Sequence, residues 1–128
     1  MTVRKTPVIA LDCAEPETLA RFYADLLAAE VRPGPTADDV EVVGGAGVRL
    51  AFRRDPGFAP PSWPRPEDSL QAHLRIRVAA ADIDEAEREA VSLGARPVGT
   101  DADDGPRPIR LLSDPAGHSF AFVAVDPV

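Results

Sequence analysis

Residue types that could recognise or transform a small molecule occur together near the middle of the chain. His73, Arg75 and Arg77 alternate with aliphatic residues, a pattern that predicts a half-buried strand with one polar face. An imidazole can position a ligand by hydrogen bonding, or act as an acid or base near neutral pH. The planar fork of an arginine suits a carboxylate or a phosphate. Each residue alone could equally be a satisfied or solvated polar group, and this alternative is strongest for Arg77.

A second stretch of interest is Leu111–Val123, which predicts a strand, a tight turn and a second strand. The turn is Asp-Pro-Ala-Gly, in which proline fixes φ and glycine tolerates the left-handed region. Beyond it, Phe120 and Phe122 alternate with Ser119, Ala121 and Val123. We expect the two phenylalanines to face the core, and the small residues to form a wall on the other side.

The remaining pattern supplies the elements that must position these residues. Two helices are predicted: one begins at Glu15-Pro16-Glu17 and has an apolar stripe through Leu27, and the other covers 81–93 and ends at Gly94. Strands are predicted at 8–11, 40–43, 48–52, 72–78 and 96–98, with a break at 31–36 and a five-proline loop at 55–68. Each half therefore places a helix after a first strand and a hairpin after the helix. This order favours a duplicated βαβββ unit over a doubly wound parallel sheet.

Composition narrows the classes of function. The 128 residues suit one domain, and 45% of them are hydrophobic, enough for a packed core. A net charge of −7 argues against nucleic acid and anionic membranes as partners. No apolar run would span a bilayer and no export signal is evident, so we expect a cytoplasmic protein. The single cysteine, Cys13, excludes an internal disulfide.

Three segments together resemble the glyoxalase/bleomycin-resistance/extradiol-dioxygenase superfamily, which has the vicinal oxygen chelate fold. They are Leu11–Leu27, His73–Val98 and Ile109–Phe122, in the order and spacing of that superfamily. The chain looks closest to the short glyoxalase-like proteins of bacteria. The resemblance implies an α+β protein in which two βαβββ modules form a curved mixed sheet around a cleft. It also implies one domain over 1–128, with modules at about 6–56 and 70–125, a loop at 57–69, and a homodimer.

The superfamily's metalloenzymes take His, Glu or Gln ligands from both modules, and the resemblance locates four such positions here. They are Val8, Ala51, His73 and Ala121. Only His73 has a donor atom, and one imidazole does not hold a divalent cation with useful affinity. His118 differs in parity from Ala121 and should point away from the cleft. We therefore expect no metal and no other cofactor.

The predicted cleft has apolar walls and one cationic side. Alternation puts Val8 and Ala10 on one wall, Ser119, Ala121 and Val123 on another, and the strand of His73 and Arg75 beside them; Ala51 belongs to the first module's wall. The proline-rich loop contains two aromatic residues, Phe58 and Trp63, whose presence in a loop needs an explanation. A dimer contact or a loop folded over its own core ranks above a ligand lid, although Trp63 is the best loop candidate for a ligand contact.

Two classes of function remain open, and the fold does not choose between them. The favoured one is a metal-free binding protein that sequesters a hydrophobic or aromatic, possibly anionic, small molecule through the cleft residues and Trp63. The alternative is an enzyme of the same fold: a lyase, isomerase, cyclase or dioxygenase that is metal-dependent or uses His73 as acid or base. A third hypothesis is an interaction domain with a vestigial cleft. The sequence does not identify the ligand.

Overall fold

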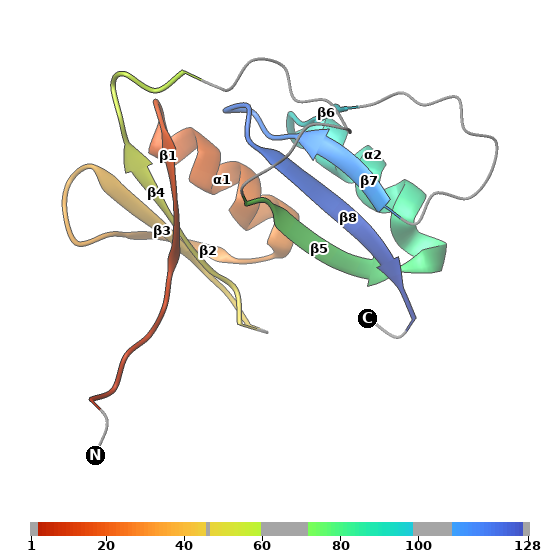
Figure 1. Cartoon of the computed structure of the whole chain (residues 1–128), viewed down its shortest axis with the longest axis horizontal. Helices are drawn as coiled ribbons and strands as arrows, with labels where there is room; N and C mark the ends of the chain where they lie inside the picture. Colours follow the sequence, from red (N-terminus) through yellow and green to blue (C-terminus); the bar gives the residue numbers. More distant parts are fainter. Residues whose placement is uncertain (1–2, 46, 60–71, 99–108, 127–128) are drawn as a thin grey trace. The chain divides into compact units, whose positions relative to one another are not determined.

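The computed structural model describes residues 3–45, 47–59, 72–98 and 109–126. It separates into two compact units, Met1–Ala59 and Pro60–Val128. Each unit has one α-helix of at least three turns and one four-stranded mixed sheet (Figure 1). The predicted α+β class and the repeated βαβββ order are therefore confirmed. No helix in the described part of the chain is long and apolar enough to cross a membrane.

Unit 1 contains β1 (Ile9–Cys13), α1 (Pro16–Leu27), β2 (Glu30–Pro33), β3 (Asp39–Val43) and β4 (Arg49–Arg54). The strand order in its sheet is β1-β4-β3-β2. The first strand lies parallel to β4, and the other neighbours are antiparallel. A parallel pair needs a long crossover, and α1 with the β2–β3 hairpin supplies it.

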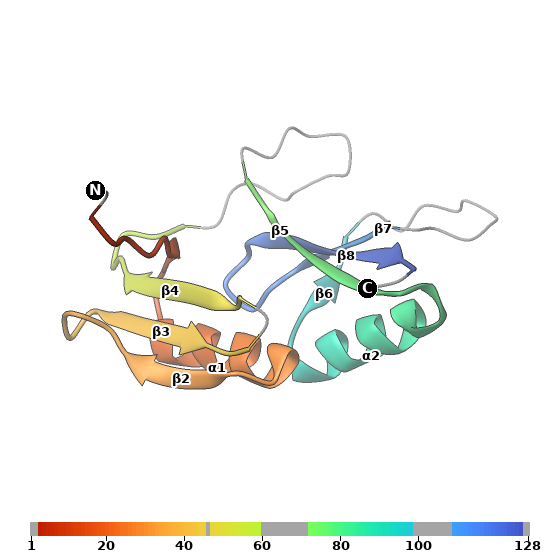
Figure 2. The same cartoon turned by 90° about the horizontal axis from the view of Figure 1, so that it is seen from below.

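Unit 2 repeats this plan with β5 (Leu74–Ala79), a short 3-10 turn η1 (Ala80–Asp82), α2 (Ile83–Leu93), β6 (Arg96–Pro97), β7 (Ile109–Ser113) and β8 (Ser119–Val125). Its strand order is β5-β8-β7-β6. The first strand, β5, again lies parallel to the last, β8, whereas β7 is antiparallel to both β8 and β6. Figure 2 shows α2 running along one side of this sheet.

Both helices begin and end where local chemistry requires it. Pro16 occupies the first turn of α1, where its missing N–H costs nothing. The helix ends at Ala28, which adopts a left-handed conformation with φ of 53° and donates its N–H to the carbonyl of Ala24. Gly94 ends α2 with φ of 121°, a value that strongly favours glycine, and donates its N–H to the carbonyls of Ala90 and Val91.

The two cores are built on aromatic pairs that join a helix to a sheet or two positions of one strand. In unit 1, Tyr23 of α1 stacks on Phe52 of β4 with ring centroids 5.6 Å apart, and meets Phe22 edge-on at 4.9 Å. In unit 2, Phe120 and Phe122 of β8 meet edge-on at 5.7 Å, as the predicted core face requires. All five aromatic residues are almost fully buried, each being at most 4% exposed.

The sequence-based elements differ from the structure in one strand and several ends. The segment 31–36 was expected to break the chain, but Glu30–Pro33 forms β2 and pairs with β3. Pro33 is compatible with this because β2 is an edge strand, where no neighbour needs its N–H. The first strand runs over Ile9–Cys13 rather than 8–11, and β5 begins at Leu74 rather than at residue 72.

Candidate functional site

Each sheet has one face packed against its helix and one face turned away from it. In unit 1 the stacking of Phe52 on Tyr23 identifies the helix side of β4. In unit 2 the ion pairs of Arg110 with Asp84 and Glu87 of α2 identify the helix side of β7. Because side chains alternate along a strand, the predicted site residues Ala10, Ala51, Arg75, Ser119 and Ala121 all belong to the opposite side, which we call the helix-free face.

The predicted wall residues of unit 1 lie on neighbouring strands. Ala10 of β1 is paired in register with Ala51 of β4. Val8 comes two residues before Ala10, just outside β1, and is half-buried. Ala51 is also half-buried, whereas Ala10 is exposed. The structure therefore brings Ala10 and Ala51 together, with Val8 at the start of the same face.

The predicted residues of unit 2 show the same arrangement. Arg75 of β5 is paired in register with Ala121 of β8, and His73 comes two residues before Arg75. Ser119 begins β8, where it pairs with Ser113 of β7. His73 therefore holds the position in unit 2 that Val8 holds in unit 1, and Ala121 corresponds to Ala51.

A hydrogen bond joins the two polar residues of this set. The Nε–H of Arg75 donates to Nε2 of His73 over 3.1 Å. His73 is half-buried and Arg75 is exposed. This contact uses the lone pair of Nε2, so the imidazole proton is on Nδ1 in this arrangement. The bond also holds the guanidinium in place, and its two terminal NH₂ groups make no hydrogen bond within the described part of the chain.

The helix-free face of unit 1 is charged, but its cations are matched by anions. Arg53 makes two hydrogen bonds to the carboxylate of Asp12 on the neighbouring strand, at 2.8 and 2.9 Å. These bonds, and then the attraction of the Asp12 charge, raise the pKa of Arg53. Arg49 pairs with Glu41 at 3.3 Å, and Arg32 pairs with Glu30 at 3.0 Å.

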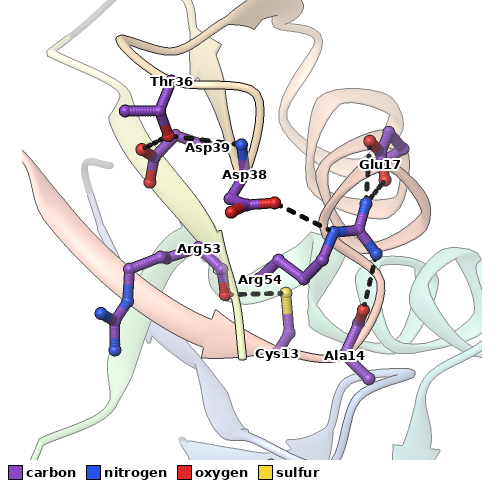
Figure 3. Close-up of polar contacts among 8 residues, drawn as sticks. All are labelled: Cys13, Ala14, Glu17, Thr36, Asp38, Asp39, Arg53 and Arg54. Carbon is purple, nitrogen blue, oxygen red and sulfur yellow. Dashed lines mark hydrogen bonds and ion pairs between the residues drawn. The ribbon is translucent and has the colours of Figure 1, made fainter. Parts of the chain in front are cut away.

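The neighbouring arginine, Arg54, has a different role because it points to the helix side. Figure 3 shows the side chains of Arg53 and Arg54 leaving β4 in opposite directions. Arg54 donates to both carboxylate oxygens of Glu17 on α1, to the carbonyl of Ala14, and lies 3.6 Å from a carboxylate oxygen of Asp38. Arg54 thus fastens α1 and the β2–β3 turn to the last strand, and is a structural residue.

The helix-free face of unit 2 has a different balance of charge. Within the described ranges, the side chain of Arg75 hydrogen-bonds only to His73, and that of Arg77 makes no hydrogen bond or ion pair. The residues beside them on β8 are Ala121 and Val123, which carry no charge. In a chain with a net charge of −7, two adjacent arginines without a carboxylate are the clearest candidate for an anion-binding element.

The residues present do not fit the metal centre implied by the resemblance. Val8, Ala51 and Ala121 have no donor atom, and Nε2 of His73 is occupied by Arg75. Among the described residues, no group of three or more His, Cys, Asp or Glu side chains is arranged to hold a metal ion. The absence of a metal nevertheless stays a prediction, to be tested by metal analysis.

One polar pair on these faces was not predicted from the sequence, and one predicted site residue is not among the described residues. The Asp12–Arg53 pair lies on the helix-free face beside Ala10 and Ala51, but only the β1–β4 register brings its two members together. Trp63 lies outside the described residues. Phe58 is half-buried and its N–H donates to the carbonyl of Asp55, in a turn that follows β4.

Comparisons with known proteins give a consistent result for the fold. A family model for a glyoxalase-like domain matches residues 8–123. A glyoxalase/bleomycin resistance protein/dioxygenase family enzyme from Burkholderia phytofirmans PsJN has a similar structure, with a TM-score of 0.68 and 12% identity over 92% of this chain and 96% of that one. No curated protein sequence matches the chain.

Two further solved structures are similar to the same extent. A glyoxalase/dioxygenase from Nostoc punctiforme is 19% identical over 94% of this chain and 90% of its own, with a TM-score of 0.66. The fosfomycin resistance protein FosX from Listeria monocytogenes, complexed with Mn(II) and sulfate ion, is 14% identical over 98% of this chain and 94% of its own, also with a TM-score of 0.66. At such identities the likeness shows the fold alone.

Proposed function

Because the chain belongs to the glyoxalase-like domain family, we propose that it is a metal-free binding protein for a hydrophobic, anionic small molecule. Enzymes and binding proteins can share one fold, so the choice rests on the residues of the site. The observation that carries the proposal is the hydrogen bond from Arg75 to Nε2 of His73. His73 is the one residue with a donor atom among the four family ligand positions, and this bond uses its Nε2 to hold the guanidinium of Arg75 instead.

The ligand chemistry follows from the surroundings of Arg75. Its guanidinium is held at one edge by His73 and presents two further nitrogens, which suits a carboxylate bound through both oxygens. On the neighbouring strand Val123 is half-buried and offers an aliphatic side chain that suits an apolar ligand body, whereas Ala121 is only 1% exposed. The same bond weighs against His73 as a catalytic base, because Nε2 would first have to leave Arg75.

The first test concerns metal. Untagged protein is dialysed in turn against Mn²⁺, Ni²⁺, Zn²⁺ and anaerobic Fe²⁺, and bound metal is measured per chain. We expect well below one equivalent of each, unchanged in His73→Ala. One equivalent of any of these ions, lost in His73→Ala, would overturn the proposal and make an enzyme the better reading.

The second test concerns the anion. Benzoate and its uncharged analogue benzamide are titrated calorimetrically into the same protein. We expect benzoate to bind and benzamide to bind at least about tenfold more weakly, since a charge-assisted hydrogen bond contributes about 1.5–3 kcal/mol. Arg75→Gln should remove this preference, and His73→Ala should reduce it by freeing the guanidinium to move.

A matched control separates binding at this face from general attraction to positive charge. Arg88→Gln removes the same charge from α2, where Arg88 is exposed and pairs with Glu85. This variant should bind benzoate as the unmodified protein does. Equal losses in the Arg75 and Arg88 variants would show that benzoate responds only to net charge.

A further inference from the structure

The two helix-free faces treat their arginines differently, and the difference centres on β5. In unit 1, Arg32, Arg49 and Arg53 each pair with a carboxylate of the same face. In the described part of unit 2, Arg75 and Arg77 have no such partner. A solvated arginine would need no explanation alone. Unit 2 has two such arginines on one face, whereas each of the three arginines on the helix-free face of unit 1 is paired with a carboxylate. This difference indicates a site for more than one negative charge.

The spacing of these two arginines along β5 sets the distance between the anionic groups of a ligand that would bind both. Arg75 and Arg77 are two residues apart on the same strand, and a strand rises about 3.3 Å per residue, so their backbone positions are separated by about 6.6 Å. The hydrogen bond to His73 fixes the guanidinium of Arg75, whereas that of Arg77 makes no hydrogen bond or ion pair among the residues that the structure describes. One end of a ligand would therefore meet a prepared site, and the other a side chain free to adjust.

The neighbouring strand, β8, supplies the side chains that lie next to the two arginines. Ala121 is paired with Arg75, and Val123 is paired with Arg77. On the far side of β8, Leu111 and Ile109 are paired with these same two residues. All four side chains are apolar: Ala121 is buried, Val123 and Leu111 are half-buried, and Ile109 is exposed. The described strands beside the arginines therefore offer no hydrogen-bonding side chain to the middle of a ligand.

From this arrangement we infer that the ligand carries two separated anionic groups on an apolar body, and that Arg77 binds the second. The inference rests on the proposed function, because it assigns a ligand class to the same face. A compact anion such as a single phosphate would meet the guanidinium that His73 holds, and would reach Arg77 only if that side chain folded back along the strand. An elongated dianion with a rigid apolar centre, for which terephthalate is a simple probe, would reach both.

The experiment compares benzoate, phthalate and terephthalate by calorimetry, at constant ionic strength, with the unmodified protein, Arg75→Gln, Arg77→Gln and the control Arg88→Gln. Benzoate has one carboxylate, phthalate has two adjacent ones, and terephthalate has two at opposite ends of the ring. We expect terephthalate to bind at least about tenfold tighter than benzoate, because it gains a second charge-assisted contact. Phthalate should gain much less, although its charge is the same.

The variants assign the gain to a residue. Arg77→Gln should bring terephthalate to within about twofold of benzoate while leaving benzoate binding unchanged, and Arg88→Gln should change neither. If benzoate binds through Arg75 but terephthalate is no tighter, the proposed function stands and the dianion inference is wrong. If phthalate gains as much as terephthalate, total charge rather than spacing is recognised, and the inference is again wrong. If none of the three acids binds, both proposals fail.

Discussion

The turn between β7 and β8 depends on Asp114, and replacing this residue tests how the strand that carries Ser119 and Ala121 is positioned. Asp114 is only 1% exposed. Its Oδ1 accepts the backbone N–H groups of Ala116 and His118 at 2.9 and 3.0 Å. Its Oδ2 lies 3.1 Å from Nδ1 of His118, which donates to it. One buried carboxylate thus satisfies three donors around the tight turn.

The size of the effect follows from these donors. In Asp114→Ala, two backbone N–H groups and one imidazole lose their acceptor, and each half-buried donor left unpaired costs about 1–3 kcal/mol. Water can reach part of this turn, so we expect the free energy of unfolding to fall by about 2–4 kcal/mol. Asp114→Asn keeps an oxygen in the place of Oδ1 and should cost only about 1 kcal/mol.

The measurement is urea unfolding followed by far-UV circular dichroism, with the midpoint and slope fitted separately. Asp25→Ala serves as the control, because Asp25 is exposed on α1 and makes no contact in the described residues; its effect should stay within about 0.5 kcal/mol. An Asp114→Ala variant as stable as this control would refute the reasoning. So would an Asn variant that is as unstable as the Ala variant.

Two further predictions concern packing in each unit. Gly34→Ala should destabilise the protein by about 1–3 kcal/mol in the same urea assay, because the new Cβ would lie 2.5 Å from the Cβ of Asp39. The control Gly45→Ala should be neutral, because a Cβ at that position meets nothing within 4 Å. Equal effects of the two substitutions would contradict the steric argument. Arg110→Met keeps the mostly buried stem but removes the ion pairs to α2 and a buried Nε that has no partner among the described residues. The loss and the relief offset each other, so we expect a net change of less than about 1.5 kcal/mol, and a larger loss would show that the ion pairs dominate.

Much of the fold was predictable because the decisive signals are local. Pro16 marks the start of α1 and Gly94 the end of α2, since each suits a backbone position that few other residues tolerate. The alternation around Phe120 and Phe122 gave the core face of β8 correctly, because one buried face dictates a period of two.

The errors and omissions have a common physical origin in non-local pairing. The segment containing Pro33 has the composition of a turn, yet it becomes a strand because β3 offers it an antiparallel partner. The Asp12–Arg53 pair depends on the register between strands that are distant in the chain. The hydrogen bond between His73 and Arg75 depends on side-chain conformations, which a pattern of residue types does not contain.

The parallel pairing of the first and last strand in each unit has a consequence for how the protein folds. The antiparallel strands β3 and β4 are joined by a short turn, as are β7 and β8, so these hairpins can close quickly. By contrast, β1 can dock only onto a finished β4, and β5 only onto a finished β8. Closing such long loops is entropically costly and slow. The strand bearing Arg75 should therefore be among the last parts of unit 2 to become ordered during folding.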